Sequence, residues 1–160
     1  MQTPKRRQLS REALGPLHKR IRPGFSGRAF HDLSAMMVNI YAAWIGFLLG
    51  CVAGAVPGLF FHNVEWLGGY TSWRRRMIRL AHIAFFGIGF INLSFALTAR
   101  SLGLDTGLEG ISILLIAGAI TMPAVCYMSA WNPACRHLFF IPAVSITLGI
   151  AMFAWRIFSP

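Results

Sequence analysis

The chain has 160 residues, of which 56% are hydrophobic and only 12% are charged, whereas soluble domains usually carry about 25% charged residues. This composition excludes an ordinary soluble domain and predicts an integral membrane protein. Fifteen Lys and Arg oppose five Asp and Glu. The three cysteines lack CxxC spacing, which excludes a readable disulfide framework or zinc cluster.

Residues 1–32 are expected to form a basic N-terminal tail, since eight of the cations lie within the first 28 residues. The remaining cations border apolar runs, so we expect anionic lipid or the acidic groups of a cofactor as counter-charges, rather than nucleic acid. The tail itself has two open interpretations. Leu14, Leu17 and Ile21 lie near one side of a weak interfacial helix, whereas Pro16 favours a partly disordered tail.

Four runs without charged residues follow the tail, at 33–61, 80–99, 110–135 and 138–155. Each is long enough to cross a bilayer once, because a transmembrane helix needs about 20 residues. In lipid the backbone must satisfy its own hydrogen bonds, which makes such runs helical. We therefore predict an all-α, antiparallel bundle of four transmembrane helices near residues 33–60, 77–99, 109–130 and 137–157, forming one transmembrane domain over residues 33–160.

The first predicted helix carries Gly46, Gly50, Gly54 and Gly58 at four-residue spacing. This spacing aligns the glycines along one stripe, where a neighbouring backbone can approach closely. The pattern predicts helix packing through a glycine zipper. Packing within the bundle is favoured over a contact between subunits, although the motif supports either arrangement.

Four crossings place both chain ends on one side of the membrane and gather four other helix ends on the opposite side. That opposite face carries the predicted anion-binding or partner-binding residues, with Glu65 as its one carboxylate: Arg74, Arg75, Arg76, Arg79 and Arg136. We expect both termini in the cytoplasm, with the protein in a bacterial inner (plasma) membrane, because long basic tails resist translocation. The arginines of the opposite face then lie on the non-cytoplasmic side, where they violate the usual positive-inside bias and require an anionic partner.

The second predicted helix places Arg75, Arg79, His82, Phe86 and Gly89 on one face, at steps of four, three, four and three. A haem b could use this order, with His82 as axial ligand, the arginines on the propionates and Gly89 making room for the macrocycle. The second ligand would be His62 or His137. However, His82 lies only about one turn inside the boundary, where a histidine can instead bond to a carbonyl or water.

No acidic residue lies within the four runs, and nothing resembles a nucleophile elbow, a phosphate loop or an HExxH helix. We therefore predict no catalytic residues and no metal site. The leading interpretation is a non-enzymatic subunit or accessory factor of a larger membrane assembly. Its expected partners are the lipid bilayer, anionic lipid, other membrane subunits or further copies of the chain. The alternative is a haem b electron-transfer subunit.

Overall fold

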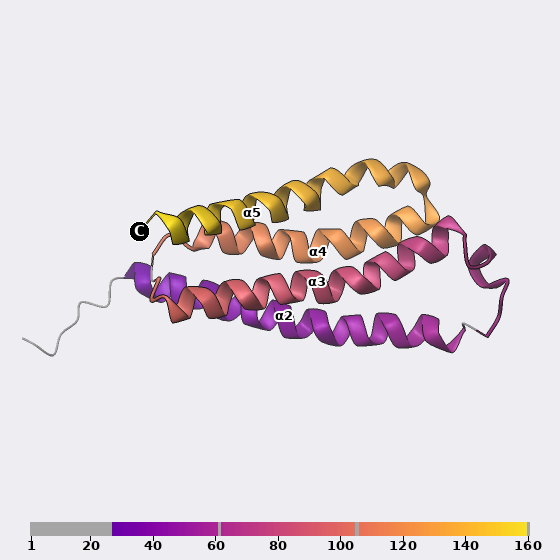
Figure 1. The fold of residues 1–160 in the computed structure, drawn as a ribbon, viewed down its shortest axis with the longest axis horizontal. Helices are drawn as coiled ribbons and strands as arrows, with labels where there is room; N and C mark the ends of the chain where they lie inside the picture. The colour runs from indigo at the N-terminus through magenta and orange to yellow at the C-terminus, as the bar shows by residue number, and fades with distance from the viewer. Residues whose placement is uncertain (1–26, 61, 105, 160) are drawn as a thin grey trace, which may run out of the picture.

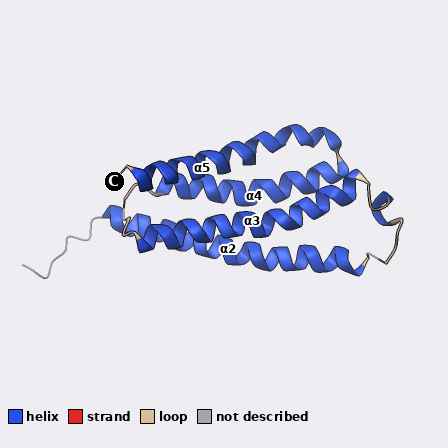
Figure 2. Cartoon of the chain, in the orientation of Figure 1, coloured by secondary structure: helices blue, strands red, loops and turns tan. Residues whose placement is uncertain are grey.

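The computed structural model of the protein describes residues 27–60, 62–104 and 106–159, so the predictions for residues 1–26 lie outside the described residues. Helices are the only regular secondary structure in the described part, and loops connect them (Figure 2). The described residues form four long helices, α2 (Gly27–Leu59), α3 (Trp73–Ser101), α4 (Glu109–Trp131) and α5 (Phe140–Phe158). These helices run antiparallel to their neighbours in the chain (Figure 1). The predicted four-helix antiparallel bundle is therefore confirmed.

The four helices are apolar enough to cross a membrane over Met36–Leu59, Trp73–Ser101, Glu109–Trp131 and Pro133–Phe158. Each span exceeds the roughly 20 residues that a bilayer requires. Large apolar side chains such as Leu48, Ile83 and Trp155 are exposed on the outer surface, where they suit contact with lipid. The chain is therefore a small polytopic membrane protein.

The start of α3 differs from its predicted position, because the helix begins at Trp73 and not near residue 77. Ser72 explains the earlier start. Its hydroxyl oxygen accepts a hydrogen bond from the Arg75 backbone N–H at 3.3 Å and its O–H donates to the Leu67 carbonyl at 2.8 Å, which caps the helix. Charged residues end a hydropathy window but not a capped helix, so the arginines lie within the first turns of α3. Similarly, α2 begins at Gly27, before the predicted residue 33.

Compact connections join the spans at the end of the bundle away from the C-terminus (Figure 1). Between α2 and α3 lies the short 3₁₀ helix η1 (Trp66–Gly68), where Leu67, Gly68 and Gly69 have φ of 58°, 84° and 85°. Glycine adopts such angles without a steric penalty, which lets the chain reverse here. Between α4 and α5 lies a second 3₁₀ helix, η2 (Pro133–Phe139). Its N-cap, Asn132, accepts a hydrogen bond from the Ala134 N–H at 3.1 Å.

The helices pack in chain order, α2 on α3, α3 on α4 and α4 on α5, and α2 also reaches α4. A buried apolar cluster joins α2, α3 and α4 near the start of α2: Met36, Phe95, Ala96, Ala99, Leu108, Ile111 and Leu115. The outermost helix, α5, packs on α4, where Ile146 lies against Gly118 and Leu115 against Gly149. It reaches α3 through Phe153, whose ring meets Phe95 edge-on at 4.8 Å.

Buried polar side chains link the helices in the half of the bundle nearer the start of α2. Asn39 of α2 donates a hydrogen bond to the Ser112 hydroxyl of α4. Asn92 of α3 donates to the Ile88 carbonyl of its own helix at 2.9 Å and to the Leu115 carbonyl of α4 at 3.4 Å. In lipid, hydrogen bonds of this kind help to fix which helices associate.

Candidate functional site

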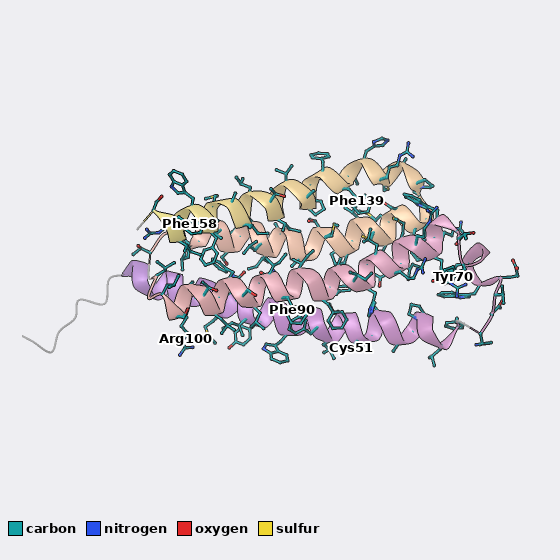
Figure 3. All side chains as sticks on the ribbon, viewed as in Figure 1. Cys51, Tyr70, Phe90, Arg100, Phe139 and Phe158 are labelled. Carbon is teal, nitrogen blue, oxygen red and sulfur yellow. The ribbon has the colours of Figure 1, made fainter. Side chains whose placement is uncertain are left out.

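The arginine end is the name we give to the membrane face formed by residues 62–79 and by η2. It lies at the opposite end of the bundle from the C-terminus, where Tyr70 is seen far from Arg100 and Phe158 (Figure 3). The antiparallel fold thus brings the start of α3 and the start of α5 to one face, as the sequence predicts. Tyr70, Trp66, Trp73 and Trp131 all lie at this end, which is typical of an aromatic belt at a membrane interface.

Arg75 is the most buried cation of the arginine end, with only 4% of its surface exposed. Its Nη1 lies 3.5 Å from the Val64 carbonyl oxygen. Its guanidinium also lies over the Trp66 ring at 5.8 Å and the Tyr70 ring at 5.4 Å. Arg75 therefore holds the loop between α2 and α3 against the bundle.

Arg79 lies one turn further along α3, and its guanidinium sits 4.6 Å from the centre of the Tyr70 ring. Tyr70 is thus in contact with two cations. Each such contact contributes about 0.5–1 kcal/mol at exposed sites. These aromatic partners were not predicted from the sequence, although the position of Tyr70 shortly before the arginines was the available signal.

The other predicted anion-binding arginines, Arg74, Arg76 and Arg136, are exposed. The first turn of α3 contains no acidic residue, although the N-terminal end of a helix carries a partial positive charge that favours acidic groups. Arg75 and Arg79, one turn apart, add a repulsive pair of about 0.2–0.5 kcal/mol. These charges make an anion favourable at this face. The binding of an anion by these five arginines stays a prediction.

His82 faces α2 and contacts it directly. Its Nδ1 lies 2.8 Å from the Gly50 carbonyl oxygen, and because a carbonyl only accepts, Nδ1 is the donor in this hydrogen bond. The ring meets Phe86 edge-on at 5.3 Å. This is the hydrogen bond to a carbonyl that the sequence analysis set against haem ligation.

The other two histidines have different surroundings. His62 is exposed, and its Nδ1 lies 2.9 Å from the Leu59 carbonyl oxygen in the same turn. His137 is exposed on η2. Because η2 packs on α4 and α5, His137 lies beside different helices from His82, which faces α2. Across residues 27–60, 62–104 and 106–159, no three His, Cys, Asp or Glu side chains gather in a way that could hold a metal ion.

Three of the four stripe glycines lie against α3. A Cβ at Gly46 would meet the Phe85 carbonyl oxygen at 3.3 Å, one at Gly50 the Phe86 ring at 2.7 Å, and one at Gly54 the His82 Nδ1 at 2.8 Å. Gly58 has nothing within 4 Å of such an atom. From the opposite side, a Cβ at Gly89 would meet Phe47 at 2.7 Å, so Phe47 fills the room that the sequence analysis assigned to a macrocycle.

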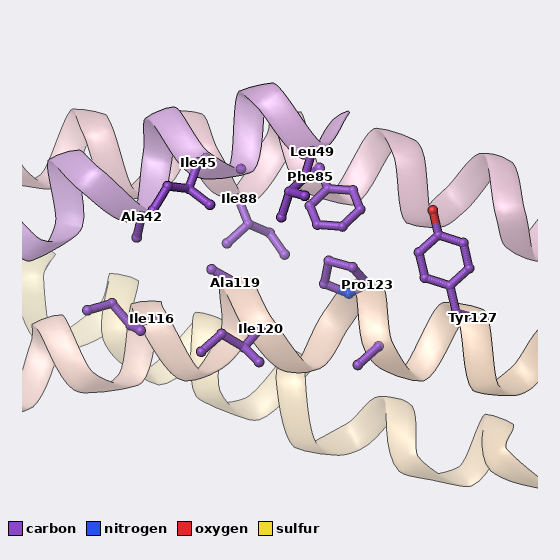
Figure 4. Close-up of a pocket in the computed structure, with 13 residues that line it drawn as sticks. Ala42, Ile45, Leu49, Phe85, Ile88, Ile116, Ala119, Ile120, Pro123 and Tyr127 are labelled. Atoms are coloured by element: carbon purple, nitrogen blue, oxygen red, sulfur yellow. The ribbon is translucent and has the colours of Figure 1, made fainter. Parts of the chain in front are cut away.

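An apolar groove runs between α2 and α4 with α3 as its floor (Figure 4). Its inner part has a volume of about 460 Å³ and is lined by residues that include Ala42, Leu49, Phe85, Ala119 and Tyr127. An outer part, also about 460 Å³, shares Leu49, Phe85 and Tyr127 with it and ends at Pro57, Trp66, Ile78 and Trp131. We call the two parts together the α2/α4 groove. Sequence reasoning missed it, because it depends on how far apart the helices pack.

No protein-family model, curated protein or solved structure matches this chain.

Proposed function

We propose that this protein is a non-enzymatic subunit or accessory factor of a membrane assembly, and that its arginine end binds anionic lipid or an acidic surface of a partner subunit. The observation that supports this function best is the set of exposed arginines, Arg74, Arg76 and Arg136, at an interfacial face whose leading helix has no acidic residue in its first turn.

Arginine suits this role chemically. Its planar guanidinium presents a fork of donors that can bind two oxygens of a phosphate or carboxylate at once. A basic side chain near an anionic membrane surface contributes about 1 kcal/mol. The backbone N–H groups at the start of α3 point in the same direction and favour the same sign of ligand charge.

The arginines differ in their contacts, and this difference supports the proposal. Arg75 and Arg79 contact the aromatic rings of the loop, which leaves ligand binding mainly to the exposed cations. Under the same proposal the stripe glycines act as a glycine zipper within the bundle, so that α2 and α3 hold the arginine end in a fixed shape. The protein then spans a bacterial inner membrane with both termini in the cytoplasm and the arginine end on the outer side.

A haem b electron-transfer subunit is the second candidate. One observation favours it: the Nδ1–H of His82 is held by the Gly50 carbonyl, which is the arrangement that leaves Nε2 able to ligate a metal. His62 or His137 would supply the second ligand, and Arg79 would contact a propionate. An absorption spectrum of the purified protein tests this candidate, since a Soret band lost in His82→Ala would support it and its absence from the wild type would reject it.

The lipid proposal is tested by native mass spectrometry of the detergent-purified protein, titrated with phosphatidylglycerol or with phosphatidylcholine of the same chains. We expect the wild type to retain phosphatidylglycerol preferentially. Arg74→Glu/Arg76→Glu should weaken that retention about ten-fold or more. Arg100→Glu is the matched control, because Arg100 is also exposed on α3 but lies at the other end of the bundle.

Two results would reject the arginine end as a lipid site. One is equal retention of the two lipids by the wild type. The other is an equal loss of phosphatidylglycerol in the Arg100→Glu control, because that would indicate a response to net charge alone. Preferential retention of a co-purifying subunit by the wild type but not by Arg74→Glu/Arg76→Glu would instead support the partner version of the proposal.

A further inference from the structure

The α2/α4 groove opens toward the arginine end. On α2 its lining runs from Ala42 to Pro57, a distance of about 22 Å at 1.5 Å per residue. One leaflet of a bilayer has a hydrocarbon depth of about 15 Å. The groove is therefore long enough for a complete acyl chain that enters from the arginine end.

The size of the groove suits a lipid chain. Each of its two parts holds about 460 Å³, and pockets of about 300–1,000 Å³ are typical of sites for small apolar ligands.

A polar group lies at the depth where a lipid has its ester linkage. Tyr127 lines both parts of the groove and is one turn from Trp131, the last residue of α4. Figure 4 shows its ring directed from α4 toward the α2 and α3 side of the groove. A phenolic O–H at this position can donate to an ester carbonyl oxygen.

The spacing of residues on α3 places a positive charge near the mouth of the groove. Ile78 of α3 lines the outer part, and Arg74, exposed, precedes it by four residues on the same helix face. Trp66 and Trp131 form the rim, which is the position that tryptophan prefers at the headgroup level. The site is thus cationic at the interface, hydrogen-bonding one turn below it, and apolar beyond.

We propose that the α2/α4 groove is a binding site for a single phospholipid with an anionic headgroup. The headgroup phosphate lies at Arg74, one ester carbonyl accepts from Tyr127, and one acyl chain lies along Leu49, Phe85 and Ala119. This inference rests on the proposed function of the arginine end and adds to it a defined ligand position. With this site the protein binds one anionic lipid molecule at a defined position, in addition to attracting anionic lipid to the arginine end.

Photo-cross-linking in vesicles tests the site, with phosphatidylglycerol and phosphatidylcholine probes that carry a diazirine on the same acyl chain. We expect the phosphatidylglycerol probe to label residues 42–49 and 116–127 more strongly than the exposed face of α5. The phosphatidylcholine probe should show a preference for the groove about five-fold smaller, the effect of one arginine near the headgroup. Arg74→Glu should abolish this difference between the probes.

Variants whose larger side chains fill the groove provide a second test of the site. Ala119→Leu narrows it from α4 and Ala42→Leu from α2, and either change should reduce labelling of the groove by phosphatidylglycerol to the level found on α5. Tyr127→Phe should reduce it in part. Ala55→Leu and Ala151→Leu are matched controls, because both alanines are exposed and neither lines the groove. These controls should label as the wild type does.

Three outcomes would overturn the site. Phosphatidylglycerol could label the groove and α5 equally, an isoprenoid quinone could displace the probe at low concentration, or the groove could cross-link to another copy of the chain. If native mass spectrometry still shows retention that depends on Arg74 and Arg76, only the groove inference fails. If that dependence is also absent, the proposed function of the arginine end fails with it.

Discussion

Replacing Gly54 by alanine should destabilise the bundle, although alanine is the better helix former. A Cβ at Gly54 would lie 2.8 Å from the Nδ1 of His82 and closer still to its Cε1, whereas non-bonded atoms of this kind pack at about 3.5–4.0 Å. The His82 ring cannot simply rotate away, because its Nδ1–H is bonded to the Gly50 carbonyl oxygen at 2.8 Å. The substitution must therefore separate α2 from α3 or break this hydrogen bond.

The expected size of the effect follows from three contributions. Overpacking costs about 1–3 kcal/mol, and a lost interhelical hydrogen bond costs about 0.6 kcal/mol in a membrane protein. The gain from replacing glycine with alanine in a helix offsets about 1 kcal/mol. The net expectation for Gly54→Ala is a loss of roughly 0.5–2.5 kcal/mol in the free energy of unfolding.

Gly58 provides a control within the same helix, because a Cβ there would meet nothing within 4 Å. Gly58→Ala should leave stability unchanged or raise it by up to about 1 kcal/mol. Thermal unfolding in detergent, followed by tryptophan fluorescence, compares the two variants. A loss of 2 kcal/mol corresponds to a fall in Tm of about 4–8 °C. If Gly54→Ala melts at or above the temperature of Gly58→Ala, close packing through the glycine stripe is refuted.

Two further predictions concern the loop at the arginine end and the buried polar groups. Tyr70→Leu removes the ring that contacts Arg75 and Arg79 and should speed amide hydrogen exchange over residues 62–72 about five-fold or more. Tyr70→Phe keeps the ring and should leave the exchange rate unchanged. Equal exchange rates in the two variants would contradict the anchoring role of the ring. Asn92→Ala removes the hydrogen bond to the Leu115 carbonyl and should cost about 0.6–1.7 kcal/mol in thermal unfolding. Ser94→Ala, an exposed neighbour on α3, should cost nothing, and no difference between these two variants would rule out a stabilising role for the buried amide.

The fold was largely predictable because hydropathy and backbone hydrogen bonding leave few alternatives in a membrane. Long apolar runs must be helical there, and an even number of short-looped helices must return the chain to the starting side. The start of α3 was not predictable by this route. It depends on the Ser72 cap, which is a local hydrogen-bonding feature and does not change the hydropathy of the sequence.

The candidate site was predictable in its location but not in its internal contacts. Helix spacing places Arg75, Arg79 and His82 on one face, yet spacing cannot say which neighbours fill the space beside them. In the structure Tyr70 contacts both arginines, and Gly50 accepts from His82. The α2/α4 groove likewise depends on the separation of helices that are distant in sequence, so no local pattern indicates it.

The most direct measurement of the central claim is the lipid composition around the protein when it is extracted from its own membrane in polymer nanodiscs, without detergent. Discs of the wild type should be enriched in anionic lipid over the bulk membrane. Arg74→Glu/Arg76→Glu/Arg136→Glu should lose this enrichment, and the Arg100→Glu control should keep it. The same lipid composition in discs of the wild type and of the triple variant would show that the arginine end does not bind anionic lipid.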